Sequence, residues 1–322
     1  MIAATTTWAA GTLITKVAVD RTTLRPSAVL TVQLATSVMF LTLIAAVRHQ
    51  LPRMETSLWR RGSSGLLEPA LSYQLFIAGL AFTSAGHASL IGAAEPLLVP
   101  FGAWLLYRQR PSRALFVLVA VVAGGSVLLV GGAGGGSIKG DLLVLAGTVS
   151  AASYVVVSSR SVAFTAPLTL ALVQQIIALA ATAAIASLIA VASGGVGHER
   201  APTLLVIALS GIVMTALPFP LYLSALRHLD AAVAAQYVAL IPVFGLGGAL
   251  LFLGETITLI QGVGAIVIIA ALAVVARVDA VADRTGTATA TATVDSVGGV
   301  DGVDGEAHVD EIRSRVGSPL AG

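Results

Sequence analysis

Two glutamates, Glu68 and Glu95, stand inside strongly apolar stretches of this 322-residue chain, and a proline directly follows each. An ionisable side chain at bilayer depth costs about 2.5–3.5 kcal/mol on insertion scales, so such a residue indicates a functional site. A carboxyl group there can bind a proton and the ammonium group of a solute in turn. This alternation couples movement of the proton to movement of the solute. We expect Glu95 to be the main residue of such a site and Glu68 the second.

Each glutamate also has a plainer interpretation. Glu95 could be a protonated or hydrogen-bonded group that only packs helices together. Glu68 follows Arg60 and Arg61 by one to two helical turns, which would allow an ion pair near a helix end. The depth of Glu68 depends on whether its helix begins at Gly65 or further upstream.

Prolines within the apolar stretches are expected to interrupt helices. Pro96 cannot donate a hydrogen bond to the carbonyl of Gly92, and Pro100 likewise frees the carbonyl of Pro96. Free carbonyls at membrane depth are tolerated only against protein or a water-filled cavity, which favours a cavity beside Glu95. Bends further along the chain could be static kinks or hinges. The prolines expected to kink helices are Pro96, Pro100, Pro218, Pro220 and Pro242.

Other polar and aromatic side chains in the apolar stretches could line a central cavity. These candidates are Gln33, Gln174, Gln236, Tyr237, Trp8, Tyr154 and His87. The aromatic ones could equally be packing residues. His87 could relay protons towards the outer face, or it could cap a helix at the membrane interface.

Composition places the chain in a membrane. It is 57% apolar and 11% charged, whereas soluble domains carry about 25% charged residues. It has no cysteine, which excludes disulfides and thiolate chemistry. Phosphate-loop, nucleophile-elbow and zinc-protease motifs are absent from the sequence, so we expect no cofactor, no metal and no enzymatic activity. The basic residues are scattered through loops, which argues against a nucleic-acid partner.

The fold class predicted is an all-α membrane protein. A spanning helix needs about 20 mostly apolar residues, and ten segments fit or nearly fit. They are Ile2–Val19, Val29–Val47, Leu66–Thr83, Ala88–Leu106, Ala114–Val130, Leu142–Val157, Leu168–Ala192, Leu204–Leu226, Ala231–Leu253 and Ile257–Val275.

The charges of the loops predict the orientation, because cytoplasmic loops carry an excess of Lys and Arg. One side holds Arg48, Arg53, Arg60, Arg61, Arg108, Arg110, Arg113, Arg160 and Arg227. The other side holds Lys16, Arg21, Arg25, Lys139 and Arg200. The first side is expected to face the cytoplasm. Ten helices then place both termini in the cytoplasm, and the protein in the cytoplasmic membrane.

The chain also repeats itself. A shift of 146 residues places Trp8 on Tyr154, Gly65 on Gly211, Phe76 on Tyr222 and Pro96 on Pro242, and a shift of 141 places Gln33 on Gln174. The predicted organisation is a five-helix repeat at 1–130, a Gly-rich linker at 131–139, a second repeat at 140–277 and a disordered cytoplasmic tail at 278–322. Five helices is an odd number, so the repeats are expected to be inverted, as in many secondary transporters. The first helix is about one turn shorter than its counterpart, which predicts a start codon upstream of Met1.

The second repeat contains family-typical sequences: Tyr222-Leu-Ser-Ala-Leu226, Leu240-Ile-Pro-Val-Phe244, and Leu253-Gly-Glu-Thr256 followed by Gln261-Gly-Val-Gly-Ala265. In order and spacing, these resemble the EamA family of the drug/metabolite transporter superfamily, over essentially 2–276. The resemblance implies a ten-helix inverted-repeat fold and transport of small metabolites, often outward. The first repeat departs from the pattern, because Arg108-Gln109 stands where the family usually has Gly-Glu.

The sequence therefore predicts a secondary transporter, an exporter of a small organic solute that works by alternating access. We expect it to use the proton gradient, and uncoupled exchange or facilitated diffusion is the open alternative. Its partners would be the solute, protons and lipid, and the sequence does not indicate an oligomeric state. The alternative is a structural or regulatory membrane protein of the same fold that transports nothing. An intramembrane enzyme is a third possibility, without a nucleophile or metal constellation to support it.

Overall fold

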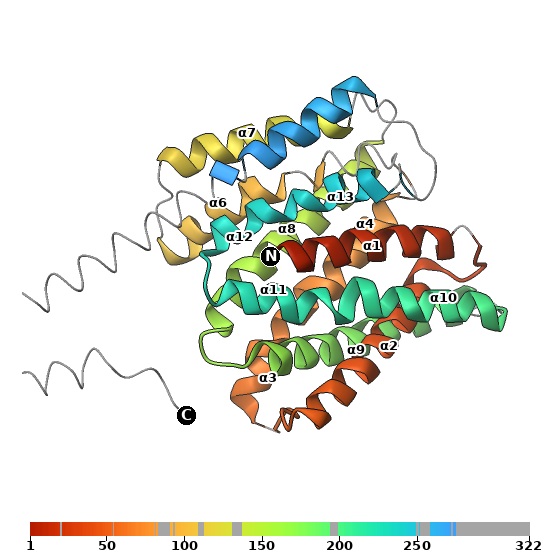
Figure 1. Cartoon of the computed structure of the whole chain (residues 1–322). Coiled ribbons are helices and arrows are strands. Elements are labelled where there is room, and N and C mark those ends of the chain that lie inside the picture. Colours follow the sequence, from red (N-terminus) through yellow and green to blue (C-terminus); the bar gives the residue numbers. More distant parts are fainter. Residues whose placement is uncertain are drawn as a thin grey trace, which may run out of the picture. The chain divides into compact units, whose positions relative to one another are not determined.

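The computed structural model describes residues 1–19, 21–53, 55–80, 82, 91–92, 94–108, 113–130, 137–193, 199–248, 251, 258–271 and 273–274. All regular secondary structure in these ranges is helical (Figure 1). Most of the helical part forms one compact unit, Met1–Ala273. The predicted tail at 278–322, most of the predicted linker and His87 lie outside the described residues.

Helices occupy all ten predicted positions. In the first repeat they are α1 (Ile2–Val19), α2 (Pro26–Val47), α3 (Thr56–Gly62), η1 (Ser63–Leu66), η2 (Leu67–Leu71), α4 (Ser72–Leu80), α6 (Glu95–Tyr107) and α7 (Arg113–Val130). In the second they are α8 (Ile138–Ser161), α9 (Pro167–Ser193), α10 (Ala201–Gly211), η3 (Ile212–Ala216), α11 (Pro218–Leu226), α12 (Ala231–Val238), α13 (Leu240–Gly248) and a last helix at Leu259–Ala271.

Several predicted boundaries differ from the structure, among them those of the third helical run and of the linker. The third helical run begins at Thr56 instead of Leu66, because the amphipathic segment around Trp59 continues directly into the apolar one. α8 begins at Ile138, so the last two residues of the predicted linker belong to a helix. The side chain of Ser137 accepts a hydrogen bond from the Gly140 amide (3.2 Å) and caps α8 at this point.

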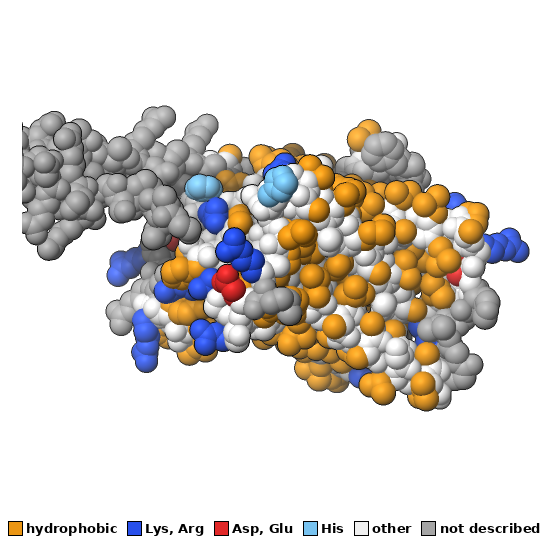
Figure 2. Space-filling view, turned by 90° about the horizontal axis from the view of Figure 1, so that it is seen from below, with side chains coloured by type: hydrophobic (Ala, Val, Ile, Leu, Met, Phe, Trp, Pro, Cys, Tyr) orange, Lys and Arg blue, Asp and Glu red, His pale blue; other side chains and the backbone are white. Residues whose placement is uncertain are grey.

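The surface of the unit is that of an integral membrane protein. Four helical runs are long and apolar enough to cross a membrane: Pro26–Val47, Ile138–Ser161, Pro167–Ala192 and Ala201–Leu226. Large apolar side chains such as Met39, Leu188 and Val191 are strongly exposed, which a water-soluble surface rarely tolerates over wide areas. In Figure 2, apolar side chains cover the middle of the displayed face, and Lys and Arg gather mainly at one end.

The two repeats pack through equivalent contacts. A Cβ atom on Gly65 would overlap the backbone of Gln174, and one on Gly211 would overlap the backbone of Gln33. The sequence repeat pairs Gly65 with Gly211 and Gln33 with Gln174, so the two contacts are copies of one another. Each joins one repeat to the other. α2 and α9, which carry the two glutamines, lie side by side (Figure 1).

The side-chain amides of these two glutamines are also engaged. Gln33 donates to Thr15 and Ser210 (2.9 Å each). Gln174 donates to Ser64 (2.9 Å) and Ser158 (3.2 Å). Gln33 and Gln174 are 2% and 0% exposed, so the structure places both side chains in the buried interface between the repeats. The small glycine opposite each one allows this close approach.

α6 ends in a strained residue. Arg108 has φ 58° and ψ 19°, a left-handed conformation that usually belongs to glycine at a helix C-terminus. This is the position where the sequence departs from the Gly-Glu pattern. Arg108→Gly should therefore raise the free energy of unfolding by about 1 kcal/mol, measured as the thermal midpoint in detergent. Arg108→Ala removes the same charge without relieving the backbone. A gain of equal size in both variants would contradict the explanation.

A loop contact joins the repeats on the side opposite most arginines. Glu199 accepts hydrogen bonds from the Thr23 amide (2.7 Å) and the Thr22 hydroxyl (2.5 Å). These bonds favour the charged form and hold the pKa of the Glu199 carboxyl below its usual value. The contact therefore adds stability above the ordinary glutamate pKa and loses it as the pH falls through the lowered one.

Glu199→Gln tests this contact. The thermal midpoint of the wild type should exceed that of the variant at pH 7. The difference should shrink as the pH is lowered below about 4. Measurements of both proteins over one pH series in the same detergent give the comparison. A difference that does not change with pH would contradict the role of the carboxylate charge.

Candidate functional site

Glu68 lies where a helix is interrupted. Its backbone is extended (φ −147°, ψ 131°) inside the η2 segment, midway along the run from Thr56 to Leu80. Pro69 follows it and cannot supply a helical hydrogen bond. Because the run begins at Thr56 and not at Gly65, about three helical turns precede Glu68 in the chain.

The predicted ion pair of Glu68 with the preceding arginines is not found. Arg61 instead donates to the Phe164 carbonyl and the Thr165 hydroxyl (3.3 Å each). Within the described residues, no ion pair joins Glu68 to Arg60 or Arg61. The contacts of Arg61 thus give no support to the interpretation of Glu68 as a partner for these arginines.

Glu95 lies at a second interruption. We expected it inside a continuous helix from Ala88, but α6 begins at Glu95 itself, and Ala94 before it is in a turn. Pro96, at the second position of α6, has no amide hydrogen to continue a helix from the preceding turn. The first turn of a helix carries a partial positive charge, so this position favours a carboxylate.

The fold brings the two carboxyl groups together. Glu68 and Glu95 are close enough for their charges to interact electrostatically. Neither side chain is fully buried. Among the described residues, neither carboxyl has a hydrogen-bond or ion-pair partner. Two like charges close together without a cation form a site that attracts protons or cationic groups.

Aromatic side chains surround this pair. Tyr73, Tyr154 and Tyr222 each lie within electrostatic range of Glu68. Trp8 donates its indole N–H to the Tyr73 hydroxyl (3.2 Å). It also meets Tyr222 edge to face, with ring centroids 5.3 Å apart. The wall therefore combines residues of both repeats.

A phenylalanine completes the aromatic cluster. Phe219 is fully buried and meets Trp8 and Tyr154 edge to face, with ring centroids 5.5 Å and 5.8 Å apart. Trp8 and Tyr154 are the repeat-matched aromatics of the sequence. The structure brings both to the carboxyl pair, where Tyr154 also donates to the Gln174 side chain (3.2 Å).

The sequence did not single out Tyr73, Phe219 or Tyr222 as site residues. Tyr222 was noted only as the repeat partner of Phe76 and as part of a family-typical stretch. Aromatics make up just 5% of the chain, so each tyrosine inside an apolar segment was a signal that could have been used.

Gln236 connects α12 to the Glu95 interruption. Its amide nitrogen donates to the carbonyl of Pro96 (3.2 Å), the group that Pro100 leaves without a helical partner. Gln236 is 0% exposed, and its Oε1 atom has no hydrogen-bond partner in the part of the chain that the structure describes. The hydroxyl of Tyr222 is likewise buried without a partner.

Two further candidates lie elsewhere or cannot be placed. Tyr237 packs against an apolar cluster that contains Val122, Leu240 and Ile268, away from the aromatic wall. His87 is outside the described residues.

The candidate prolines stand near the starts of new helices. Pro218 opens α11 after the irregular η3 segment, and Pro220 follows two residues later. Pro242 is the third residue of α13, which begins after a turn at Ala239. The same pattern holds in the first repeat, where Pro96 stands in the first turn of α6 and Pro100 in the second.

The interruptions occur at repeat-related places. η2 and η3 correspond under a shift of 145 residues, and the turns at Ala94 and Ala239 under the same shift. The residues 146 positions after Glu68 and Glu95 are Met214 and Ile241. Both repeats thus break their helices, and only the first places carboxyl groups there.

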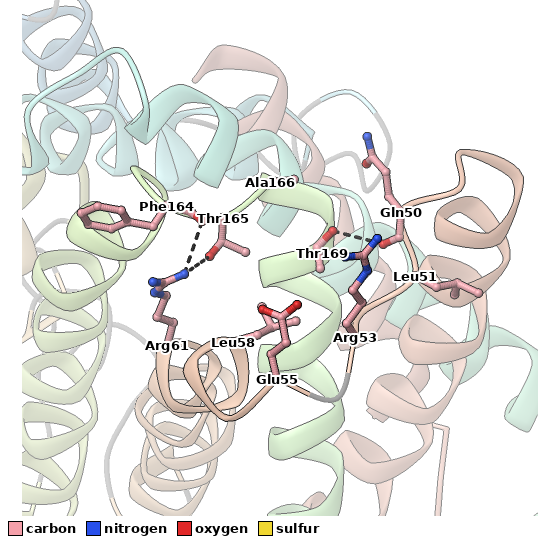
Figure 3. A pocket seen from close by; sticks show the side chains of 10 residues that line it. All are labelled: Gln50, Leu51, Arg53, Glu55, Leu58, Arg61, Phe164, Thr165, Ala166 and Thr169. Carbon is pink, nitrogen blue, oxygen red and sulfur yellow. Dashed lines mark hydrogen bonds between the residues drawn. The ribbon is translucent and has the colours of Figure 1, made fainter. Parts of the chain in front are cut away.

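A surface pocket of about 230 Å³ lies apart from these residues, between the α2–α3 and α8–α9 loops (Figure 3). In Figure 3, Arg61 points towards the α8–α9 loop, and Thr169 donates to the carbonyl of Gln50 (3.1 Å). The pocket contains none of the candidate site residues. We assign the chemistry to the carboxyl pair, because a charged group in an apolar interior requires a partner and a charged group on the surface does not.

The described residues contain no group of three or more His, Asp or Glu side chains that could hold a metal ion. The arrangement around Glu68 and Glu95 offers acceptor oxygens, hydroxyls and ring faces. It is suited to binding protons and donors of hydrogen bonds.

Comparisons with known proteins agree with this architecture. The sequence model of the EamA-like transporter family matches residues 1–131 and 138–277. A solved structure titled "Crystal structure of protein" superposes with a TM-score of 0.70 and 18% identity, over 85% of this chain and 94% of that one. At this identity the similarity concerns the fold alone. A search of curated proteins finds no match.

Proposed function

This chain belongs to the EamA-like transporter family, and from that premise we propose that it is a secondary transporter that exchanges a small organic solute for protons at Glu68 and Glu95. The observation that carries the proposal is the carboxyl pair at two adjacent helix interruptions. Secondary transporters often build their sites from interrupted helices at the interface between repeats. Two acids in an apolar interior are costly unless they are used.

The proposed cycle uses competition at one site. When both carboxyls are exposed to one side of the membrane, either protons or a solute neutralises them. The neutralised site can then be exposed to the other side, because the uncompensated charges no longer have to cross an apolar layer. The two repeats would move relative to each other. The contacts between them are equivalent, so two related arrangements of the repeats can alternate.

The proposal includes ten spanning helices in two inverted repeats, with both termini in the cytoplasm. It is supported by the helices at all ten predicted positions and by the excess of arginine on one side. Location in the cytoplasmic membrane and outward transport are parts of the same proposal.

Solute flux in proteoliposomes tests the proposed function. An imposed pH gradient should drive accumulation of at least one member of a panel of amino acids, amines, nucleosides and sugars. Liposomes without protein provide the background. If well-folded protein moves no member of the panel under any gradient, the transport proposal is contradicted and the non-transporting alternative gains support.

A further inference from the structure

Two buried polar atoms on residues around Glu95 have no hydrogen-bond partner among the described residues. They are the hydroxyl of Tyr222 on α11 and the Oε1 atom of Gln236 on α12. Tyr222 and Gln236 are 1% and 0% exposed. A buried polar atom without a hydrogen bond costs about 1–3 kcal/mol, so such atoms usually meet a water or a ligand.

Both atoms belong to the surroundings of the carboxyl pair. The hydroxyl of Tyr222 lies within electrostatic range of Glu95 and Glu68. The amide nitrogen of Gln236 is bonded to the carbonyl of Pro96, one residue after Glu95. That bond engages the amide nitrogen and leaves the amide oxygen as an acceptor without a partner among the described residues.

The available groups share one chemical character. Two carboxyls and an amide oxygen accept hydrogen bonds, and a phenol hydroxyl can either accept or donate. The faces of Trp8, Tyr154 and Tyr222 carry negative potential, which attracts cations. Among the described residues, no Lys, Arg or His side chain has an electrostatic interaction with Glu68 or Glu95.

From this set we infer that the solute of the proposed transporter binds through a protonated amino group, held by Glu95 with Tyr222 Oη and Gln236 Oε1 as hydrogen-bond partners. The inference rests on the proposed function and adds the chemical class of the solute. An ammonium group supplies two or three N–H donors, which matches these acceptors. A carboxylate or phosphate solute would meet the two carboxyls with like charge and would find no cationic partner among the described residues.

A matched series of probes tests the inference. Benzylamine, benzyl alcohol and benzoate share a ring and differ in charge. Their dissociation constants are measured by calorimetry on the full chain in lipid nanodiscs at pH 7. Benzylamine should bind at least about tenfold more tightly than either of the others. Equal binding, tighter benzoate or no saturable benzylamine binding would overturn the inference.

Tyr222→Phe separates a ligand contact from a structural one. It removes only the orphan hydroxyl, so the thermal midpoint without ligand should stay the same or rise. Benzylamine affinity should fall about tenfold, while benzyl alcohol affinity should barely change. Tyr107→Phe, at the far end of α6, is the control. A lower midpoint with unchanged benzylamine affinity would assign the hydroxyl to a structural water.

The outcomes distinguish this inference from the proposed transport function, because a solute can bind without being transported. Selective benzylamine binding without flux of any solute would contradict only the transport proposal. Proton-coupled flux of a neutral or anionic solute that depends on Glu95 would contradict only the amine assignment.

Discussion

Glu95→Gln should reduce solute accumulation driven by a pH gradient to the level of liposomes without protein. Gln keeps the size of the side chain and most of its packing but cannot exchange a proton. Removing one partner of a buried charge pair costs about 2–5 kcal/mol, which corresponds to a loss of affinity of roughly 30-fold or more. The measurement is the initial rate of uptake under a fixed pH gradient.

Glu68→Gln should act in the same direction, because the two carboxyls interact. Glu55→Gln is the control, since Glu55 is exposed at the start of α3, beside the surface pocket. Thermal unfolding of each variant shows whether it is folded. Normal pH-driven uptake by folded Glu95→Gln would show that Glu95 only packs helices, which is its plainer interpretation.

Gly65→Ala should be the most damaging small substitution in the helix interfaces. The new methyl group would overlap the Gln174 carbonyl oxygen, and helix backbone cannot shift as a flexible side chain can. Overpacking typically costs about 1–3 kcal/mol, and contact with backbone places this site at the upper end. Separation of the helices would also stretch the hydrogen bond from Gln174 to Ser64 (2.9 Å).

Gly262→Ala is the matched control. A Cβ at Gly262 meets nothing within 4 Å, so the usual helix preference of Ala over Gly should stabilise it by about 1 kcal/mol. The two variants should thus move the thermal midpoint in opposite directions. Gly211→Ala should repeat the effect of Gly65→Ala, because its methyl group would overlap Gln33. A midpoint for Gly65→Ala that equals that of the wild type would contradict the close packing.

The helices and the repeat could be predicted from local pattern. Runs of apolar residues located all ten helical positions, and the 146- and 141-residue shifts paired Gly65 with Gly211 and Gln33 with Gln174. The contacts of the glutamines could not be predicted, because a polar side chain in an apolar segment suits a cavity and a helix interface equally. The glycine opposite each glutamine lets it approach the other repeat closely, and only the fold shows which residues are opposite.

The site could be predicted in part. Both glutamates were identified by type and by the proline that follows each. The helix interruption at Glu68 was not predicted. The interruption at Glu95 was predicted only in part, since a proline can kink a helix or begin a new one. Tyr73 and Tyr222 were missed because an isolated aromatic residue normally packs in a core. Their relation to the carboxyls arises only in the folded chain, because α4 and α11 are far apart in the sequence.

The most direct test of the central account is proton movement caused by the solute alone. Proteoliposomes containing a pH-sensitive dye would receive a transported solute with no imposed pH gradient. The account predicts a solute-dependent pH change in the lumen with wild-type protein and none with Glu95→Gln. Solute flux of normal rate without a pH change would contradict exchange of the solute for protons at this site.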